Sequence, residues 1–203
     1  MDGQKFHKKM ATGYFKSIYP VIANNIIKKS RKSQGLCVDV GGGTAVLGVE
    51  IARISQFNII NVDKDARSIQ LAEEYIKSQE MEKRIIPLNC SAEDLQLASE
   101  SADLVVSRGS VFFWEDKVKG MREIYRVLKP GGFAYVGGGM GNYKLSQQIL
   151  TGLATDKTWI EETNWRYRQN LPIHLKLMMR ETNIPNWSIE SSQEGTWILI
   201  NKK

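Results

Sequence analysis

The 203-residue chain is poor in the residues that build disulfide frameworks and metal sites, with only two cysteines and two histidines. Cys37 begins one predicted strand and Cys90 ends another, so we expect both to be reduced packing residues. Cysteines and histidines this far apart in the sequence have no metal-ligand spacing. We therefore predict a protein without structural disulfides and without a bound metal.

The sequence also lacks any apolar run of about eighteen residues or more, so no transmembrane helix is expected. Residues 1–9 lack the apolar stretch of a signal peptide. Because 42% of the residues are hydrophobic, the chain can bury a substantial core, and we expect one domain over residues 1–203. We predict a cytoplasmic protein with no membrane partner; the oligomeric state is not predicted.

The formal net charge of +6 raises the question of a nucleic-acid partner. The densest basic run, residues 28–32, ends an apolar helical segment, where cations interact favourably with the helix dipole. A second basic block with interleaved aromatic residues, as an RNA-binding face requires, is absent from the sequence. Nucleic acid is therefore the minority interpretation, and a small-molecule substrate is favoured.

The most informative stretch is a short apolar strand that leads directly into three glycines, residues 38–43 (VDVGGG). A helix is predicted over residues 46–52. Because glycine has no Cβ, this strand–loop–helix unit lets the backbone approach a nucleotide-like ligand closely. A second strand ends on Asp63, about 20 residues beyond the glycines, where a carboxylate can hold two ribose hydroxyls. The sequence therefore predicts a cofactor that contains a ribose.

The spacing of the glycines separates two kinds of cofactor. A dinucleotide fingerprint, G-x-G-x-x-G, needs a small residue three positions after Gly43, where Val46 stands. Residues 41–45 instead fit G-x-G-x-G, with Ala45 in place of the third glycine. An oxidoreductase with a nucleotide cofactor is disfavoured for this reason, and also because a second dinucleotide-binding half is missing.

With this loop the chain resembles the class I S-adenosylmethionine-dependent methyltransferases, whose first motif usually reads V-D-x-G-x-G-T-G. Further segments in the family's order carry the resemblance: residues 91–95 match its adenine-side loop, 102–107 its fourth strand, and 124–133 (IYRVLKPGGF) its helix–turn–strand signature. The match spans roughly residues 36–141. Within the family, the chain is similar to small methyltransferases related to the quinone-biosynthesis C-methyltransferases.

The alternation of strands and helices predicts a parallel sheet. Strands are expected near residues 36–40, 57–63, 85–88, 103–107 and 133–136, and a terminal hairpin at 187–190 and 197–200. The resemblance implies that this hairpin supplies the last two strands. The expected fold is α/β: a Rossmann-like, seven-stranded, mostly parallel sheet with helices on both faces and a C-terminal antiparallel hairpin.

Two segments lie outside this alternating scheme. Residues 1–34 are expected to form an N-terminal helical cap, in which a helical segment over 14–29 is either continuous or broken at Pro20. Residues 142–184 form an insertion, and insertions at this position commonly cover the substrate pocket in methyltransferase-like folds. The alternative is an ordinary helix pair whose aromatic side chains fill its own small core.

The resemblance implies how the chain would hold S-adenosylmethionine. The glycine loop would direct backbone N–H groups toward the methionine part, Asp39 would face the ammonium group through water, and Asp63 would accept from both ribose hydroxyls. Ser91 stands where the family often has an aspartate for the adenine amino group, so Glu93 either contacts that group or caps a short helix. The implied cofactor-binding residues are Asp39, Gly41, Gly42, Gly43, Asp63, Lys64, Ser91, Ala92, Glu93, Ser107 and Arg108.

Methyl transfer asks little chemistry of the protein, because the sulfonium is already activated and alignment alone supplies roughly 7–11 kcal/mol. A general base is needed only for an acceptor that is protonated at neutral pH. The candidates for such a base are His7, Tyr14, Tyr19 and Glu115, and no spacing singles one out. Arg108, Glu115, Tyr14 and Tyr19 are the candidate catalytic residues. Arg108 is expected to pair with an anion: the cofactor carboxylate, an acidic acceptor, or the nearby acids at 115–116.

The sequence therefore predicts methyl transfer from S-adenosylmethionine to a small-molecule acceptor by in-line displacement. The N/D-P-P-Y signature of amino-group methyltransferases is missing, as is a cysteine suited to a covalent pyrimidine mechanism, which argues against methylation of DNA bases. Two alternatives stay open: a protein that binds S-adenosylmethionine without catalysis, whose cofactor motifs would look the same, and an RNA methyltransferase.

Overall fold

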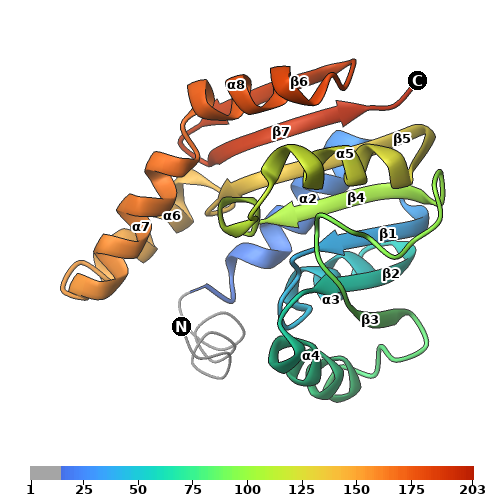
Figure 1. Cartoon of the computed structure of the whole chain (residues 1–203). Coiled ribbons are helices and arrows are strands. Elements are labelled where there is room, and N and C mark those ends of the chain that lie inside the picture. The colour runs from blue at the N-terminus through green and yellow to red at the C-terminus, as the bar shows by residue number, and fades with distance from the viewer. Residues whose placement is uncertain (1–14) are drawn as a thin grey trace.

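The computed structural model describes residues 15–203, which form a seven-stranded sheet with helices on both faces (Figure 1). The strands are β1 (Gln34–Val40), β2 (Gln56–Asp63), β3 (Ile85–Asn89), β4 (Ala102–Arg108), β5 (Leu128–Gly139), β6 (Trp187–Ser192) and β7 (Gly195–Asn201). Their order is β3-β2-β1-β4-β5-β7-β6. The first five are parallel, and β7 is antiparallel to both of its neighbours. The predicted Rossmann-like sheet and terminal hairpin are confirmed.

Helices cover the two faces of the sheet. They are α2 (Ile18–Ser30), α3 (Val46–Arg53), α4 (Ala66–Ser78), α5 (Lys117–Val127), α6 (Tyr143–Gly152), α7 (Lys157–Gln169) and α8 (Pro172–Thr182), with a 3-10 turn, η1 (Val111–Phe113). Of these described helices, none is long and apolar enough to cross a membrane. The helices α2, α3 and α4 share one apolar core with the sheet, while α5 and α8 share the other.

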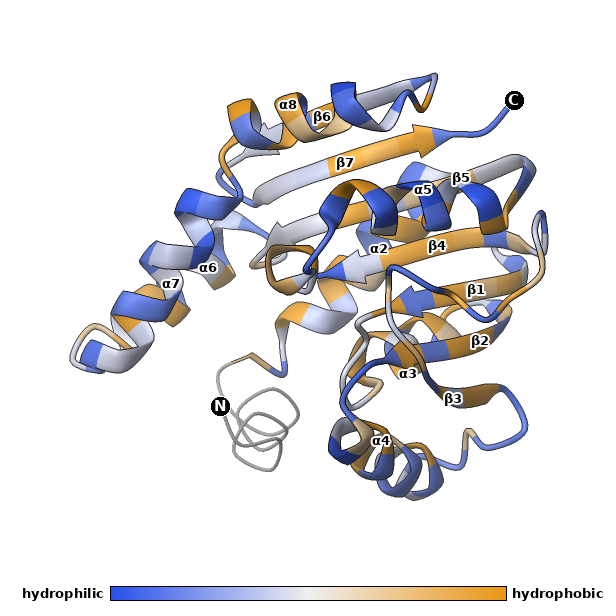
Figure 2. Ribbon diagram, viewed as in Figure 1, coloured by the Kyte–Doolittle hydropathy of each residue, from blue (hydrophilic) through white to orange (hydrophobic). Residues whose placement is uncertain are grey.

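The alternation of side chains along a strand divides these two cores. In β1, Cys37 packs on the α2–α3 side, whereas Val38 and Val40 pack on the α5–α8 side. Both faces are therefore apolar, as a sheet covered on both sides requires, and Figure 2 shows the central strands largely in orange. Against this apolar background, the fully buried Asp39 and Asn61 stand out as polar residues of β1 and β2.

The structure decides between the alternatives for the first irregular segment and differs from the expected helix pair in the second. The helix α2 is unbroken, because Pro20 lies in its first turn, where a missing N–H leaves no hydrogen bond unmade. Residues 142–184 form three helices and not a pair, since Pro172 begins α8 directly after α7. The helices α6 and α7 project beyond the end of the sheet to which the arrowheads of β1, β4 and β5 point (Figure 1), and α8 packs on the α5 side of the sheet.

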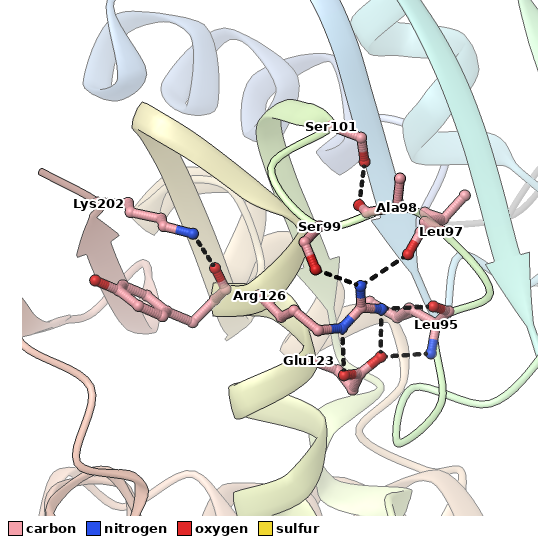
Figure 3. Close-up of polar contacts among 9 residues, drawn as sticks. Leu95, Leu97, Ala98, Ser99, Ser101, Glu123, Arg126 and Lys202 are labelled. Atoms are coloured by element: carbon pink, nitrogen blue, oxygen red, sulfur yellow. Dashed lines mark hydrogen bonds and ion pairs between the residues drawn. The ribbon is translucent and has the colours of Figure 1, made fainter.

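An arginine of the predicted 124–133 signature fixes the adenine-side loop (Figure 3). Arg126, on α5, forms a two-pronged ion pair with Glu123, with Nε–Oε1 and Nη2–Oε2 distances of 2.7 Å. Its Nη groups also donate to the carbonyls of Leu95 and Leu97 at 2.8 Å. Arg126 holds the pKa of Glu123 below its usual range through this hydrogen bond. The helix therefore holds the loop that follows residues 91–93.

We expect Arg126→Met to lower the free energy of unfolding by about 2–3 kcal/mol, because the carbonyls of the loop lose charged donors. Lysine at this position should recover little, since an ammonium cannot reproduce the guanidinium fork. Urea unfolding measures the change. Arg67→Met is the control, because the exposed Arg67 side chain donates to Gln70 in its own helix α4, and its loss should shift stability by less than about 0.5 kcal/mol. Equal midpoints for the two variants would contradict this role.

Candidate cofactor and acceptor site

The glycine loop between β1 and α3 is a tight turn that needs left-handed backbone. Gly41 and Gly43 have φ of +66° and +55°, and Ala45 has φ of +63° at the N-cap of α3. At Gly41 a Cβ would lie 2.3 Å from the Oγ of Ser110, so glycine is required there by space as well as by conformation. The chain accommodates Ala45 in a conformation that non-glycine residues rarely adopt.

Glycine is required at position 42 because neighbouring side chains lie too close for a Cβ, and not because of its backbone conformation. A Cβ there would lie 2.2 Å from Oδ1 of Asn61 and 2.8 Å from Cγ of Asp39. The Gly42 N–H donates to the carbonyl of Val62 at 2.9 Å, and Nδ2 of Asn61 donates to the Gly43 carbonyl at 3.1 Å. Asn61 was missed at the sequence level, although a polar residue inside an apolar strand is the signal that could have found it.

Asp63, at the end of β2, shapes the same loop. Its Oδ2 accepts from the Gly43 N–H at 2.9 Å, and its Oδ1 accepts from the Asp65 N–H at 3.0 Å. Burial raises the pKa of Asp63, and these backbone donors offset part of the rise. Each carboxylate oxygen can accept more than one hydrogen bond, so the predicted contact with ribose hydroxyls is compatible with this geometry. Asp65 caps α4, as expected.

Asp39 is a carboxyl group held under the glycine loop. It is fully buried, and neither of its oxygens has a hydrogen-bond partner among residues 15–203. Burial raises its pKa to about 7, the charge of Asp63 adds to the rise, and the Gly48 N–H opposes it. A buried carboxylate without a counter-charge is costly. The site therefore fits a cationic group, such as the ammonium of S-adenosylmethionine, near this point.

The adenine-side residues are partly engaged with each other. The Ser91 hydroxyl donates to the Glu93 carboxylate, whose other oxygen accepts from the N–H groups of Glu115 and Asp116 at 2.8 and 3.3 Å. The expected short helix at this point is absent, and Glu93 instead ties the loop to the chain before α5. Ala92 lines the cavity described below.

Ser107 and Arg108, the two predicted cofactor-binding residues at the end of β4, have different surroundings. The Ser107 hydroxyl lies 2.7 Å from that of Ser110 and is buried away from the cavity wall. Arg108 lines the cavity and donates to the Tyr19 hydroxyl at 3.2 Å and to the Gly139 carbonyl at 3.1 Å. The acids at 115–116, which were one predicted partner of Arg108, make other contacts. The predicted ion pair with these acids is therefore wrong.

Those two acids have other roles. Glu115 forms an ion pair with Lys64 at 3.1 Å, and both side chains are exposed. An exposed pair of this kind contributes little to stability. Asp116 is the N-cap of α5 and accepts from the Lys119 N–H at 2.9 Å. Tyr14 and His7 lie outside the described residues.

A single cavity of about 1340 Å³ joins these parts at the carboxyl ends of the parallel strands. Gly41, Gly43, Asp63, Lys64, Ala92 and Glu93 line one region of it. Aromatic side chains line another: Phe15, Phe112, Phe113, Trp114, Trp159 and Trp165. The volume exceeds the roughly 300–1,000 Å³ of a site for one small molecule. The cavity can therefore accommodate a nucleoside cofactor together with a second ligand.

The projecting helices form part of the aromatic region. Leu150 of α6 and Trp159 and Trp165 of α7 line the cavity. The rings of Phe113, in η1, and Trp165 are 5.2 Å apart, which joins the loop after β4 to α7. Residues 142–184 therefore reach the site, although they belong to no part of the cofactor motifs. Across residues 15–203, no cluster of three or more His, Cys, Asp or Glu side chains could hold a metal ion.

The fold and the site are those of a class of proteins: Rossmann-like methyltransferases, which have a cavity for a nucleoside cofactor at the ends of the strands. A family model described as a methyltransferase domain matches residues 38–136. A Methanococcus maripaludis protein, described provisionally as an S-adenosyl-L-methionine-dependent methyltransferase, is 34% identical with a TM-score of 0.94, over 99% of this chain and 92% of that one. The chain belongs to the class I S-adenosylmethionine-dependent methyltransferases.

Two relatives of known name are similar to part of this chain. The 2-methyl-6-phytyl-1,4-hydroquinone methyltransferase of Spinacia oleracea is 44% identical over 101 residues, which are 49% of this chain and 28% of that protein. A ubiquinone/menaquinone biosynthesis C-methyltransferase of Geotalea daltonii is 30% identical over 100 residues, 48% of this chain and 43% of that protein. The chain therefore matches less than half the length of each of these two relatives.

Proposed function

We propose that this protein transfers the methyl group of S-adenosylmethionine to a small-molecule acceptor with an aromatic or quinonoid ring, by in-line displacement. The observation that carries the proposal is the single cavity that joins the glycine loop and Asp63 to an aromatic-walled region. The names of the two curated relatives specify hydroquinone and quinone compounds. An apolar ring would pack against the side chains of Phe112 and Trp159.

S-adenosylmethionine, when bound, supplies a methyl group already activated as a sulfonium. The protein's part is to bind and orient. The glycine-loop backbone would hold the methionine end, Asp63 would hold the ribose, and Asp39 would offset the positive charge. At Gly138, a Cβ would lie 3.1 Å from Cζ of Phe112, so glycine lets this ring lie directly on the end of β5. Alignment in a dry cavity can then supply most of the rate.

Of the residues proposed as general bases, the structure describes Glu115 and Tyr19, and neither suits that role. Glu115 pairs with Lys64 and does not line the cavity. Burial raises the pKa of Tyr19, so its hydroxyl keeps its proton at neutral pH. We therefore propose that this acceptor loses its proton without help from these side chains, as an already ionised or electron-rich ring would.

The test is a screen of small-molecule extracts with S-adenosylmethionine that carries a labelled methyl group. We expect the label in a small-molecule product, and no product with the Asp63→Ala variant. Label in RNA would replace the proposal with an RNA methyltransferase. Tight binding of S-adenosylhomocysteine with no labelled product from any extract would favour a non-catalytic binding protein. The cytoplasmic location expected from the sequence remains part of this proposal, to be checked by fractionation.

A pH dependence follows from the buried position of Asp39. Its folded-state pKa of about 7 lies above the ordinary value of 3.8, so between these values the folded chain holds a proton that the unfolded chain has released. The contribution of Asp39 to the free energy of unfolding of the ligand-free protein should therefore fall as pH rises from about 4 to about 7, with a slope approaching 1.4 kcal/mol per unit, and then level off. Denaturant midpoints across this range measure the slope.

Asp39→Asn replaces the carboxyl group by an amide, which does not ionise, and so removes the contribution of Asp39 to the pH dependence. This variant is therefore expected to stabilise the ligand-free protein at neutral pH. It should also weaken S-adenosylmethionine binding, and should remove the increase in affinity that ionisation of Asp39 gives wild type as pH rises through 7. Asp65→Asn is the control, because Asp65 is exposed, hydrogen bonds to Ser68 lower its pKa, and the slope should persist. An Asp39→Asn variant that is less stable than wild type at pH 7 would contradict this assignment.

A further inference from the structure

Arg108 is a cation in the cavity wall whose contacts are all neutral. Its Nη groups donate to the Tyr19 hydroxyl and to the Gly139 carbonyl, and its guanidinium carbon lies 5.2 Å from the centre of the Tyr19 ring. Its Nε is buried and has no hydrogen-bond partner among residues 15–203. A phenol, an amide carbonyl and an aromatic ring can orient a guanidinium, but none of them carries a negative charge.

Most of the nearby carboxylates have other partners. Burial raises the pKa of Tyr19 and the charge of Asp39 adds to that rise, but Asp39 makes no hydrogen bond to Arg108. Glu115 pairs with Lys64, and Glu162 pairs with Arg166. Asp116 caps α5, and Glu93 accepts from the chain before it. Two further acids of the cavity wall, Glu161 and Glu194, are exposed and form no ion pair with Arg108. Within the described part of the chain, Arg108 therefore forms no ion pair.

Tyr19 orients this guanidinium from outside the cavity wall. Its hydroxyl accepts from Nη1 of Arg108, and the side chain is almost fully buried. Arg108 lines the cavity, whereas Tyr19 does not. A guanidinium held in place in this way presents its remaining N–H donors as the planar fork that a carboxylate recognises.

We propose that Arg108, oriented by Tyr19, is the receptor for a carboxylate group in this cavity, resting on the proposed function for the second ligand. Two ligands could bring the carboxylate: the amino-acid end of the cofactor, or an acceptor that is an aromatic acid. Either ligand would supply the ion-pair partner that the surrounding side chains do not provide. A negative group beside the sulfonium would also prevent the repulsion between two cations in a dry site.

The test uses four variants and binding measurements that need no turnover. Arg108→Met removes the charge at similar length, Arg108→Lys keeps the charge and loses the fork, and Tyr19→Phe keeps the ring and loses the hydroxyl. Arg166→Met is the matched control, because Arg166 lines the same cavity but is paired with Glu162 at 2.9 Å. Melting temperature without ligand is recorded for each variant.

The first arm compares S-adenosylhomocysteine with the analogue that lacks its carboxyl group, by calorimetry. If the cofactor supplies the carboxylate, wild type and Arg166→Met prefer the carboxylated form at least tenfold, and Arg108→Met loses the preference. The second arm compares benzoate with benzyl alcohol on protein saturated with S-adenosylhomocysteine. If the acceptor supplies the carboxylate, the preference for benzoate disappears in Arg108→Met and weakens in Arg108→Lys and Tyr19→Phe.

The stability of the ligand-free variants shows whether Arg108 binds a ligand or only supports the fold. Removing a charge that forms no ion pair should leave the ligand-free Arg108→Met protein at least as stable as wild type. The proposal is overturned if Arg108→Met keeps both preferences, or if its only effect is a lower melting temperature. Failure of wild type to bind S-adenosylhomocysteine would instead contradict the proposed function. Benzoate binding without the cofactor would then still report on Arg108.

Discussion

Asp63→Ala is expected to weaken the binding of S-adenosylhomocysteine at least about a hundredfold while the protein stays folded. The substitution would remove the two proposed hydrogen bonds to the ribose, each worth roughly 1.5–3 kcal/mol when one partner is charged. It also removes the acceptor of the Gly43 N–H, 2.9 Å away, which holds the glycine loop in place. Loss of ribose contacts and loss of loop geometry therefore act in the same direction.

Calorimetry measures the affinity, and circular dichroism reports the fold. Asp65→Ala is the matched control two residues along the chain. Asp65 caps α4 by accepting from the N–H groups of Arg67 and Ser68, so its loss should lower stability by about 1 kcal/mol and leave the affinity nearly unchanged. If Asp63→Ala binds as tightly as Asp65→Ala, Asp63 does not hold the ribose and the cofactor assignment loses its main support.

Gly42→Ala is expected to abolish measurable cofactor binding and to lower the free energy of unfolding by about 1–3 kcal/mol, the usual range for overpacking. The added methyl would overlap Oδ1 of Asn61 and the carboxyl group of Asp39. Both acceptors belong to fully buried side chains in neighbouring strands, so neither can move aside into solvent. The loop would have to move off the sheet, and its N–H groups would leave the methionine end of the cavity.

Gly48→Ala, six residues further along, is the control. Its Cβ would meet Cγ2 of Ile59 at 3.4 Å, an ordinary contact, inside the helix α3. Alanine in a helix interior is favoured over glycine by roughly 0.5–1 kcal/mol, so this variant should be slightly more stable and should bind normally. Denaturant unfolding and calorimetry on both variants decide the matter. Normal binding by Gly42→Ala would show that the loop does not need this close approach.

Local patterns in the sequence already determine much of this protein. Apolar strands are recognisable because side chains alternate across a sheet, and Pro87 lies on the edge strand β3 because an edge tolerates a missing N–H. The turn after β1 is recognisable because left-handed backbone and close packing select glycine. The place of Asp63 follows as well, since the carboxyl ends of parallel strands meet at one edge of the sheet.

Contacts between elements were decided only by the tertiary structure. Arg108 and Tyr19 are 89 positions apart, and no local pattern in the sequence predicts their contact. Nor does one predict that Arg108 forms no ion pair with the acids at 115–116. The acidic partner of Lys64, the placement of Glu93 across the chain before α5, and the aromatic wall from α7 depend in the same way on how β2, β4 and the projecting helices are arranged. Backbone conformation depends on neighbours in the chain, whereas the partner of a side chain depends on which strands and helices are packed together in space.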